Sequence, residues 1–154
     1  EVLRIMKDSC LGTYGACALV AALGLKFVLL AGLEPGRVLP VLLVAHAASR
    51  LGAIALMRGL DYVRDDEQAK AKPMATRLGL GSLLVAALWP AAALALAVEP
   101  RQTLAVVAAL LLVHLWLRAW FRRRLGGYTG DCLGAAQQLG ELACYLVLGS
   151  RLWS

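Results

Sequence analysis

Five blocks of mostly apolar residues, each about 20 residues long, limit this chain to folds that a membrane can accommodate. A helix needs roughly 20 apolar residues to cross the hydrocarbon core of a bilayer. Apolar residue types make up 60% of the 154 residues and charged types only 17%, which excludes a disordered chain and an ordinary soluble globule. We therefore predict an all-α, polytopic integral membrane protein with one transmembrane domain. The predicted spans are residues 10–33, 38–57, 78–98, 103–121 and 133–153.

Lysine and arginine alternate between the connections, and this predicts the orientation of the chain. Segments 1–9, 58–77 and 122–131 are rich in basic residues, whereas the turns at 34–37 and 99–102 carry one arginine each. Because cytoplasmic loops of membrane proteins are enriched in Lys and Arg, we place the three basic segments in the cytoplasm. Topology thus accounts for the net charge of +6, and we predict no nucleic-acid partner.

The first cytoplasmic segment, IMKDSCLGTYG (5–15), leads into span one. Asp8, Gly12 and Gly15 are four and three residues apart, so they share a helix face, and small residues there allow another helix to approach closely. Asp8 then supplies an oxygen ligand of the kind that Mg²⁺ prefers. Alternatively, Asp8 only caps the helix N-terminus. The spacing favours neither interpretation.

The glycine-rich segment LGGYTGD (125–131) opens the last span. Its glycines permit backbone conformations and close approaches that other residues do not. A turn that feeds a helix N-terminus presents free N–H groups to phosphate, and Arg122 to Arg124 add positive charge just before it. The alternative interpretation is a flexible turn followed by an N-cap Asp131.

Polar residues continue from this turn into the last span. Asp131 and Gln138 are seven residues apart and lie almost in line on a helix, and Glu141 follows about three turns into the span. A carboxylate inside a membrane is costly and is usually functional or paired. Lys26 and Arg50 are the cations at similarly internal positions. The sequence leaves open an interior ion pair or a role in ion or substrate binding.

The loop at 58–77 is long in a chain whose other turns are minimal. Its acidic run after Tyr62 is followed by the basic KAKP (70–73), a pattern typical of a solvated loop. Long loops in compact proteins nevertheless often carry function. Carboxylates at a membrane edge, a phosphate-binding turn and many basic residues, without a paired nucleophile and histidine, favour metal-assisted phosphoryl transfer.

Three segments together resemble the cobalamin synthase family, the membrane enzymes also called adenosylcobinamide-GDP ribazoletransferases. They are IMKDSCLGTYG (5–15), YVRDD (62–66) with KAKP (70–73), and LGGYTGDCLGAAQQ (125–138). The resemblance implies that α-ribazole or its 5′-phosphate attacks the corrinoid-linked phosphate of adenosylcobinamide-GDP and releases GMP. It further implies dependence on Mg²⁺ and a location in the bacterial inner membrane, with the active site on the cytoplasmic side.

The resemblance also suggests roles for individual residues. Asp8 and Asp131 would belong to a Mg²⁺–diphosphate site, and Glu141 would be a further catalytic residue. Phosphate, nucleotide and turn-shaping contacts would come from a wider set: Lys7, Ser9, Gly12, Gly15, Tyr62, Arg64, Lys72, Gly127, Thr129, Gly130 and Gln138. The sequence leaves open whether copies of the chain associate as a homo-oligomer.

The family carries an acidic motif of the form DGxxDxxDG before the KDS block, and no such motif precedes Lys7 here. We therefore expect the chain to correspond to the C-terminal part of a proteobacterial-type member, with further metal ligands upstream. Two rival functions remain open. One is a CDP-alcohol-type phosphotransferase of lipid synthesis, and the other is a transporter or assembly subunit with a path lined by Lys26, Arg50 and Glu141.

Overall fold

The computed structural model describes residues 12–63 and 79–150, and in these ranges the chain forms five helices and no strand longer than a single bridge. This confirms the predicted all-α class. The helices are α2 (Thr13–Ala31), α3 (Pro35–Gly59), α5 (Leu80–Ala97), α6 (Pro100–Leu125) and α7 (Gly130–Leu148).

Proline starts two of these helices where the sequence predicted tight turns. Pro35 and Pro100 occupy the first turns of α3 and α6, after Glu34 and Glu99. Proline is favoured there because its missing N–H would have no partner inside the helix. At its other end α6 continues four residues beyond the predicted span and includes the three arginines at 122–124. Arginine is a good helix former, and positive charge is favourable at a helix C-terminus.

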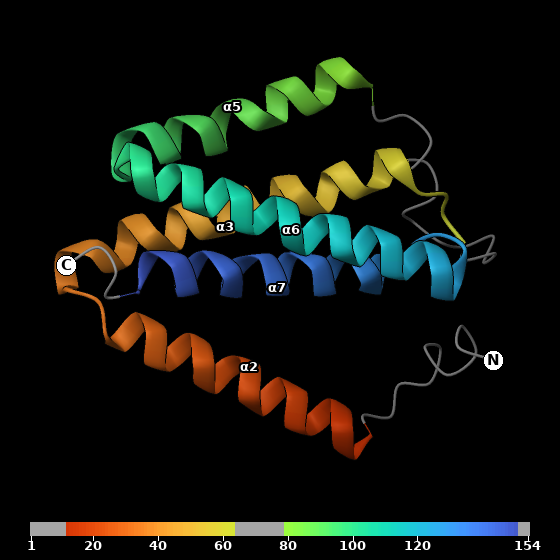
Figure 1. The fold of residues 1–154 in the computed structure, drawn as a ribbon, viewed down its shortest axis with the longest axis horizontal. Helices are drawn as coiled ribbons and strands as arrows, with labels where there is room; N and C mark the ends of the chain where they lie inside the picture. The colour runs from red at the N-terminus through yellow and green to blue at the C-terminus, as the bar shows by residue number, and fades with distance from the viewer. Residues whose placement is uncertain (1–11, 64–78, 151–154) are drawn as a thin grey trace.

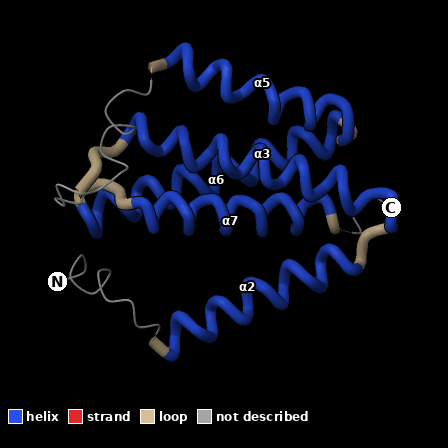
Figure 2. Tube along the Cα trace, turned by 180° about the vertical axis from the view of Figure 1, so that it is seen from behind, coloured by secondary structure: helices blue, strands red, loops and turns tan. Residues whose placement is uncertain are grey.

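The helices reverse direction at each connection, as Figure 1 shows. The starts of α2, α5 and α7 and the ends of α3 and α6 therefore lie at one end of the bundle, on the right in Figure 1 and on the left in Figure 2. The predicted topology required this grouping. It brings the helix ends that adjoin the three basic segments to the same end of the bundle.

Helix α7 differs from the other four. By length and composition α2, α3, α5 and α6 could each span a membrane, whereas α7 is less apolar. It packs extensively against both α3 and α6 and contributes eight buried residues. A helix face that packs against protein needs less apolar surface than one that faces lipid, so the half-buried Gln137 and the buried Glu141 are tolerated there. Helix α2 is the opposite case and buries none of its residues.

Two glycines make room for a buried histidine where α3, α6 and α7 cross. A Cβ atom added to Gly52 would fall onto the imidazole of His114, within 2.9 Å of Cδ2 and closer to other ring atoms. One added to Gly140 would lie 3.1 Å from His114 Cε1. The ring cannot easily turn away because its Nδ1 lies 2.8 Å from the carbonyl oxygen of Leu110.

We expect Gly52→Ala to destabilise the bundle. Overpacking a tight interior position typically costs about 1–3 kcal/mol. The matched control is Gly24→Ala in α2, where an added Cβ would meet nothing within 4 Å, so the better helix propensity of alanine should leave stability equal or higher. Thermal unfolding in detergent measures both variants. Equal melting temperatures for the two would contradict the packing of His114 against Gly52.

Candidate functional site

The turn between α6 and α7 is built by local hydrogen bonds. Gly126 ends α6 with φ of +76°, a left-handed conformation that favours glycine, and its N–H donates to the carbonyl of Arg122 at 3.2 Å. Thr129 is the N-cap of α7, and its hydroxyl oxygen accepts from the N–H of Cys132 at 3.4 Å. The alternative of an N-cap Asp131 is therefore wrong. Asp131 lies in the first turn of α7 and is exposed.

This turn pairs with the residues that follow α3. The N–H of Tyr128 donates to the carbonyl of Asp61 at 2.9 Å, and the N–H of Val63 donates to the carbonyl of Tyr128 at 3.1 Å. The Tyr62 and Tyr128 rings meet edge to face, with centroids 5.5 Å apart. Two segments that the sequence singled out separately, at Tyr62 and at the glycine-rich turn, thus form one structure.

Gly127 makes this pairing possible. A Cβ atom added there would overlap the carbonyl oxygen of Asp61 and lie 2.6 Å from Val63 Cγ1. At Gly130, by contrast, an added Cβ would meet nothing within 4 Å. The two glycines that the sequence analysis grouped together therefore have different structural roles, and only Gly127 is needed for a close backbone approach.

Tyr128 anchors the turn in the protein interior and is only 1% exposed. It belongs to a buried cluster with Phe121 of α6 and Ala136 of α7. Burial raises the pKa of Tyr128, and the neighbouring Tyr62 and Asp61 raise it further. The phenol consequently stays neutral near pH 7 and fixes the turn by packing rather than by charge.

The groups around this turn suit an anionic ligand and a hard cation. Asp61 and Asp131 are exposed carboxylates, and Arg122 to Arg124 form an exposed basic group at the end of α6. Helix N-termini favour phosphate. No group of three or more His, Cys, Asp or Glu that could hold a metal occurs within residues 12–63 and 79–150. Mg²⁺ is commonly held by one or two carboxylates together with substrate phosphates and water, so these donors fit it.

Of the other predicted site residues, some lie at the start of α2 and some lie outside the described ranges. Gly12 caps α2 and Gly15 lies in its first turn, and both are exposed. A Cβ added to Gly12 would meet nothing within 4 Å, so no described helix makes the predicted close approach at this point. Five predicted site residues lie outside the described ranges: Lys7, Asp8, Ser9, Arg64 and Lys72.

A second polar cluster surrounds Glu141 in the middle of α7. Lys26 Nζ lies 2.6 Å from Glu141 Oε2, and His46 Nδ1 lies 3.1 Å from Oε1. Lys26 also donates to Gln138 Oε1 at 2.5 Å, and Gln137 Nε2 approaches Glu141 at 3.5 Å. Glu141 thus forms an interior ion pair, and its catalytic role stays a prediction. His46 is a further partner that the sequence did not predict, because nothing in its spacing links it to a residue 95 positions away.

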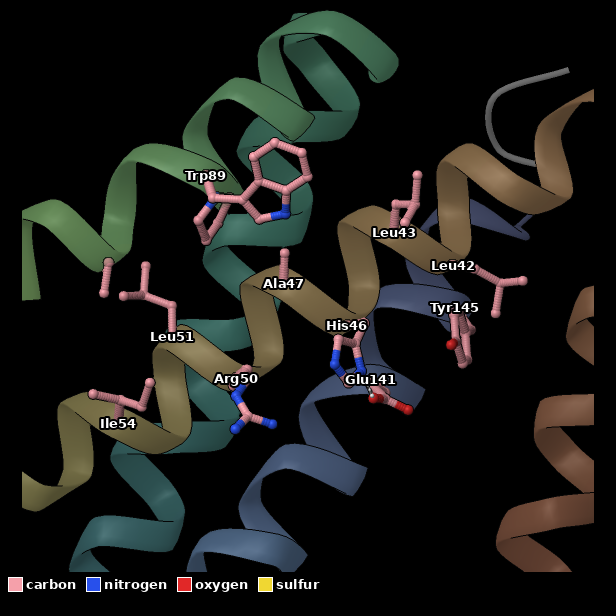
Figure 3. Close-up of a pocket in the computed structure, with 12 residues that line it drawn as sticks. Leu42, Leu43, His46, Ala47, Arg50, Leu51, Ile54, Trp89, Glu141 and Tyr145 are labelled. Atoms are coloured by element: carbon pink, nitrogen blue, oxygen red, sulfur yellow. Dashed lines mark hydrogen bonds and ion pairs between the residues drawn. The ribbon is translucent and has the colours of Figure 1, made fainter. Parts of the chain in front are cut away.

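An apolar groove of about 610 Å³ runs past this cluster, between α3, α5 and α7 (Figure 3). Ala47 belongs to its floor on α3, and Trp89 lines it from α5. His46 points toward Glu141 at its polar edge, and Arg50 follows one turn along α3. Glu141 is ten residues beyond Asp131 on α7, which corresponds to about 15 Å along the helix. Glu141 is thus well separated from the turn that starts α7.

Comparison with known proteins assigns the chain to a family. The model of the cobalamin-5-phosphate synthase family matches residues 1–149. The chain belongs to this family. Membership does not favour the two rival functions, a lipid phosphotransferase and a transporter. No solved structure matches the chain significantly.

Several relatives in the cobalamin-5-phosphate synthase family are named adenosylcobinamide-GDP ribazoletransferase. The one from Shewanella woodyi is 47% identical over 152 residues, which cover 96% of this chain and 58% of the relative. The relative from Leptothrix cholodnii is 48% identical over 160 residues, which cover 99% of this chain and 61% of the relative. The relative from Shewanella piezotolerans is 43% identical over 149 residues, which cover 95% of this chain and 57% of the relative. The chain thus spans about three-fifths of the length of these relatives.

Proposed function

We propose that this chain forms part of an adenosylcobinamide-GDP ribazoletransferase, a phosphotransferase that assembles the nucleotide loop of cobalamin. A hydroxyl of α-ribazole or α-ribazole 5′-phosphate attacks the corrinoid-linked phosphorus of adenosylcobinamide-GDP. The hydroxyl loses its proton as a new P–O ester bond forms, the bond from this phosphorus to the oxygen that bridges the two phosphates breaks, and GMP leaves with that oxygen. The family match over residues 1–149 carries this proposal.

The turn that starts α7 supports the same chemistry. We assign Asp131 to hold Mg²⁺ together with Asp8, and the exposed arginines at 122–124 to attract the diphosphate. Bound Mg²⁺ would neutralise charge on the phosphate oxygens and orient them. The pairing of Asp61 with Tyr128 fixes where α7 begins, and would thereby set where Asp131 stands relative to a bound diphosphate.

We further propose that the protein lies in the bacterial inner membrane, with this turn on the cytoplasmic side. The helix ends that adjoin segments 1–9, 58–77 and 122–131 share one end of the bundle. The excess of Lys and Arg in these segments supports a cytoplasmic location for that end.

Release of GMP from adenosylcobinamide-GDP and α-ribazole 5′-phosphate, measured in detergent, tests the proposal. We expect release that requires Mg²⁺ and stops when EDTA removes it. The Leptothrix cholodnii relative serves as the positive control. The chain is assayed alone and as a hybrid that carries the part of this relative that the chain does not match. Failure of the hybrid beside an active relative would overturn the proposal.

A further inference from the structure

Helix α2 is attached to the bundle mainly at one end. It buries no residue, and its principal neighbour among the described helices is α7. Leu29, Leu30 and Leu33 pack against the core where α2 ends. The first turns of α2 stand apart from α7 in both Figure 1 and Figure 2.

Lys26 makes the polar contact that lies closest to the N-terminal half of α2, the half that stands apart from the bundle. Its ammonium lies 2.6 Å from the Glu141 carboxylate and 2.5 Å from the Gln138 amide oxygen. The side chains of Lys26 and Glu141 are only 16% and 9% exposed. A lysine inside an apolar helix is costly unless it is paired. Since Glu141 also contacts His46, one carboxylate joins α2, α3 and α7.

We infer that Lys26 is a positioning residue: its ion pair with Glu141 sets the direction in which α2 leaves the bundle. Lys26 is thirteen positions after Thr13, the first residue of α2, which corresponds to about 20 Å along the helix axis. No residue of α2 between Thr13 and Lys26 is buried. The ion pair therefore fixes where the first turn of α2 stands relative to the first turn of α7. In its consequence for catalysis, the inference rests on the proposed function, because Asp8 precedes α2 and Asp131 starts α7.

A distance measurement tests the inference without reference to activity. Spin labels are placed on the exposed Cys17 of α2 and on a cysteine replacing the exposed Arg123 of α6. Cys10 is replaced by serine, and the buried Cys132 and Cys144 are shielded from the reagent. We expect Lys26→Met to lengthen and broaden the distance distribution by several ångström. Lys26→Arg should preserve it.

Two further variants separate positioning from general unfolding. The double variant with Lys26→Glu and Glu141→Lys restores an ion pair with the charges exchanged. It should return the distribution of label distances toward that of the unsubstituted protein. A label pair on cysteines that replace the exposed Leu43 of α3 and Leu111 of α6, with Cys17 replaced by serine, should report no change in Lys26→Met. An unchanged, narrow distance between α2 and α6 in Lys26→Met would overturn the inference. A change at both label pairs would also overturn it, because Lys26 would then hold the whole fold.

The kinetic consequence is measured in the hybrid enzyme. Misplacing reacting groups by about 1 Å can cost on the order of a hundredfold in rate, so Lys26→Met should lower kcat by roughly tenfold to a hundredfold with little change in KM. Lys26→Arg should recover most of kcat. A normal kcat in Lys26→Met would overturn the catalytic consequence. If the unsubstituted hybrid released no GMP, the proposed function would fail, while the spin-label distances would still decide the role of Lys26.

Discussion

Asp131→Asn should remove nearly all Mg²⁺-dependent GMP release from the hybrid enzyme. The substitution keeps the size of the side chain and removes the charge that we assign to the metal site. A metal ligand contributes several kcal/mol to the stabilisation of the transition state. The expected loss in kcat is therefore roughly a hundredfold or more, at about 1.36 kcal/mol for each factor of ten. Initial rates across a Mg²⁺ titration measure the loss and any shift in the metal requirement.

The control for this substitution is Glu99→Gln, which removes an exposed carboxylate beside α6 at the opposite end of the bundle. Its rate and Mg²⁺ dependence should be normal. Asp131 also lies in the first turn of α7, where a negative charge stabilises a helix by about 0.3–1 kcal/mol. If that were its whole function, Asp131→Asn would lower the melting temperature slightly and leave the Mg²⁺ titration unchanged. This outcome would remove Asp131 from the metal site.

Gly127→Ala should disrupt the turn that starts α7 and abolish activity. The new methyl group would overlap the carbonyl oxygen of Asp61, a backbone atom that cannot rotate away. The hydrogen bonds that join Tyr128 to Asp61 and Val63 would have to break or move. Overpacking of this kind costs about 1–3 kcal/mol or more. We expect a lower melting temperature in detergent together with loss of GMP release.

Gly134→Ala provides the matched control for Gly127→Ala. It adds the same methyl group to α7 one turn beyond Asp131, at an exposed position where a Cβ would meet nothing within 4 Å. This variant should be as stable as the unsubstituted protein. If Gly127→Ala retained both stability and activity, the pairing between residues 61–63 and 127–129 would be unnecessary for the site.

The ion pair of Lys26 with Glu141 shows how far sequence reasoning reaches. The sequence identified Lys26 as a candidate partner because charges inside membrane spans are few and costly. It could not choose between an ion pair and a ligand site, since the answer depended on which faces of α2 and α7 meet. His46 illustrates the limit more clearly, because its partner lies 95 residues away in the chain.

The sequence by itself determined the helical class, the places of the five described helices, the alternation of their ends and the proline-bounded turns, whereas only four of these helices are apolar enough to span a membrane. These features follow from local composition: a run of about 20 apolar residues predicts a span wherever its neighbours lie. Tertiary structure alone decided that α7 packs against both α3 and α6, that Thr129 rather than Asp131 caps it, and that Tyr62 pairs with Tyr128. The physical reason is that lipid is as apolar as leucine, so hydropathy does not select which helix faces pack together. Close packing and the pairing of polar groups make that selection.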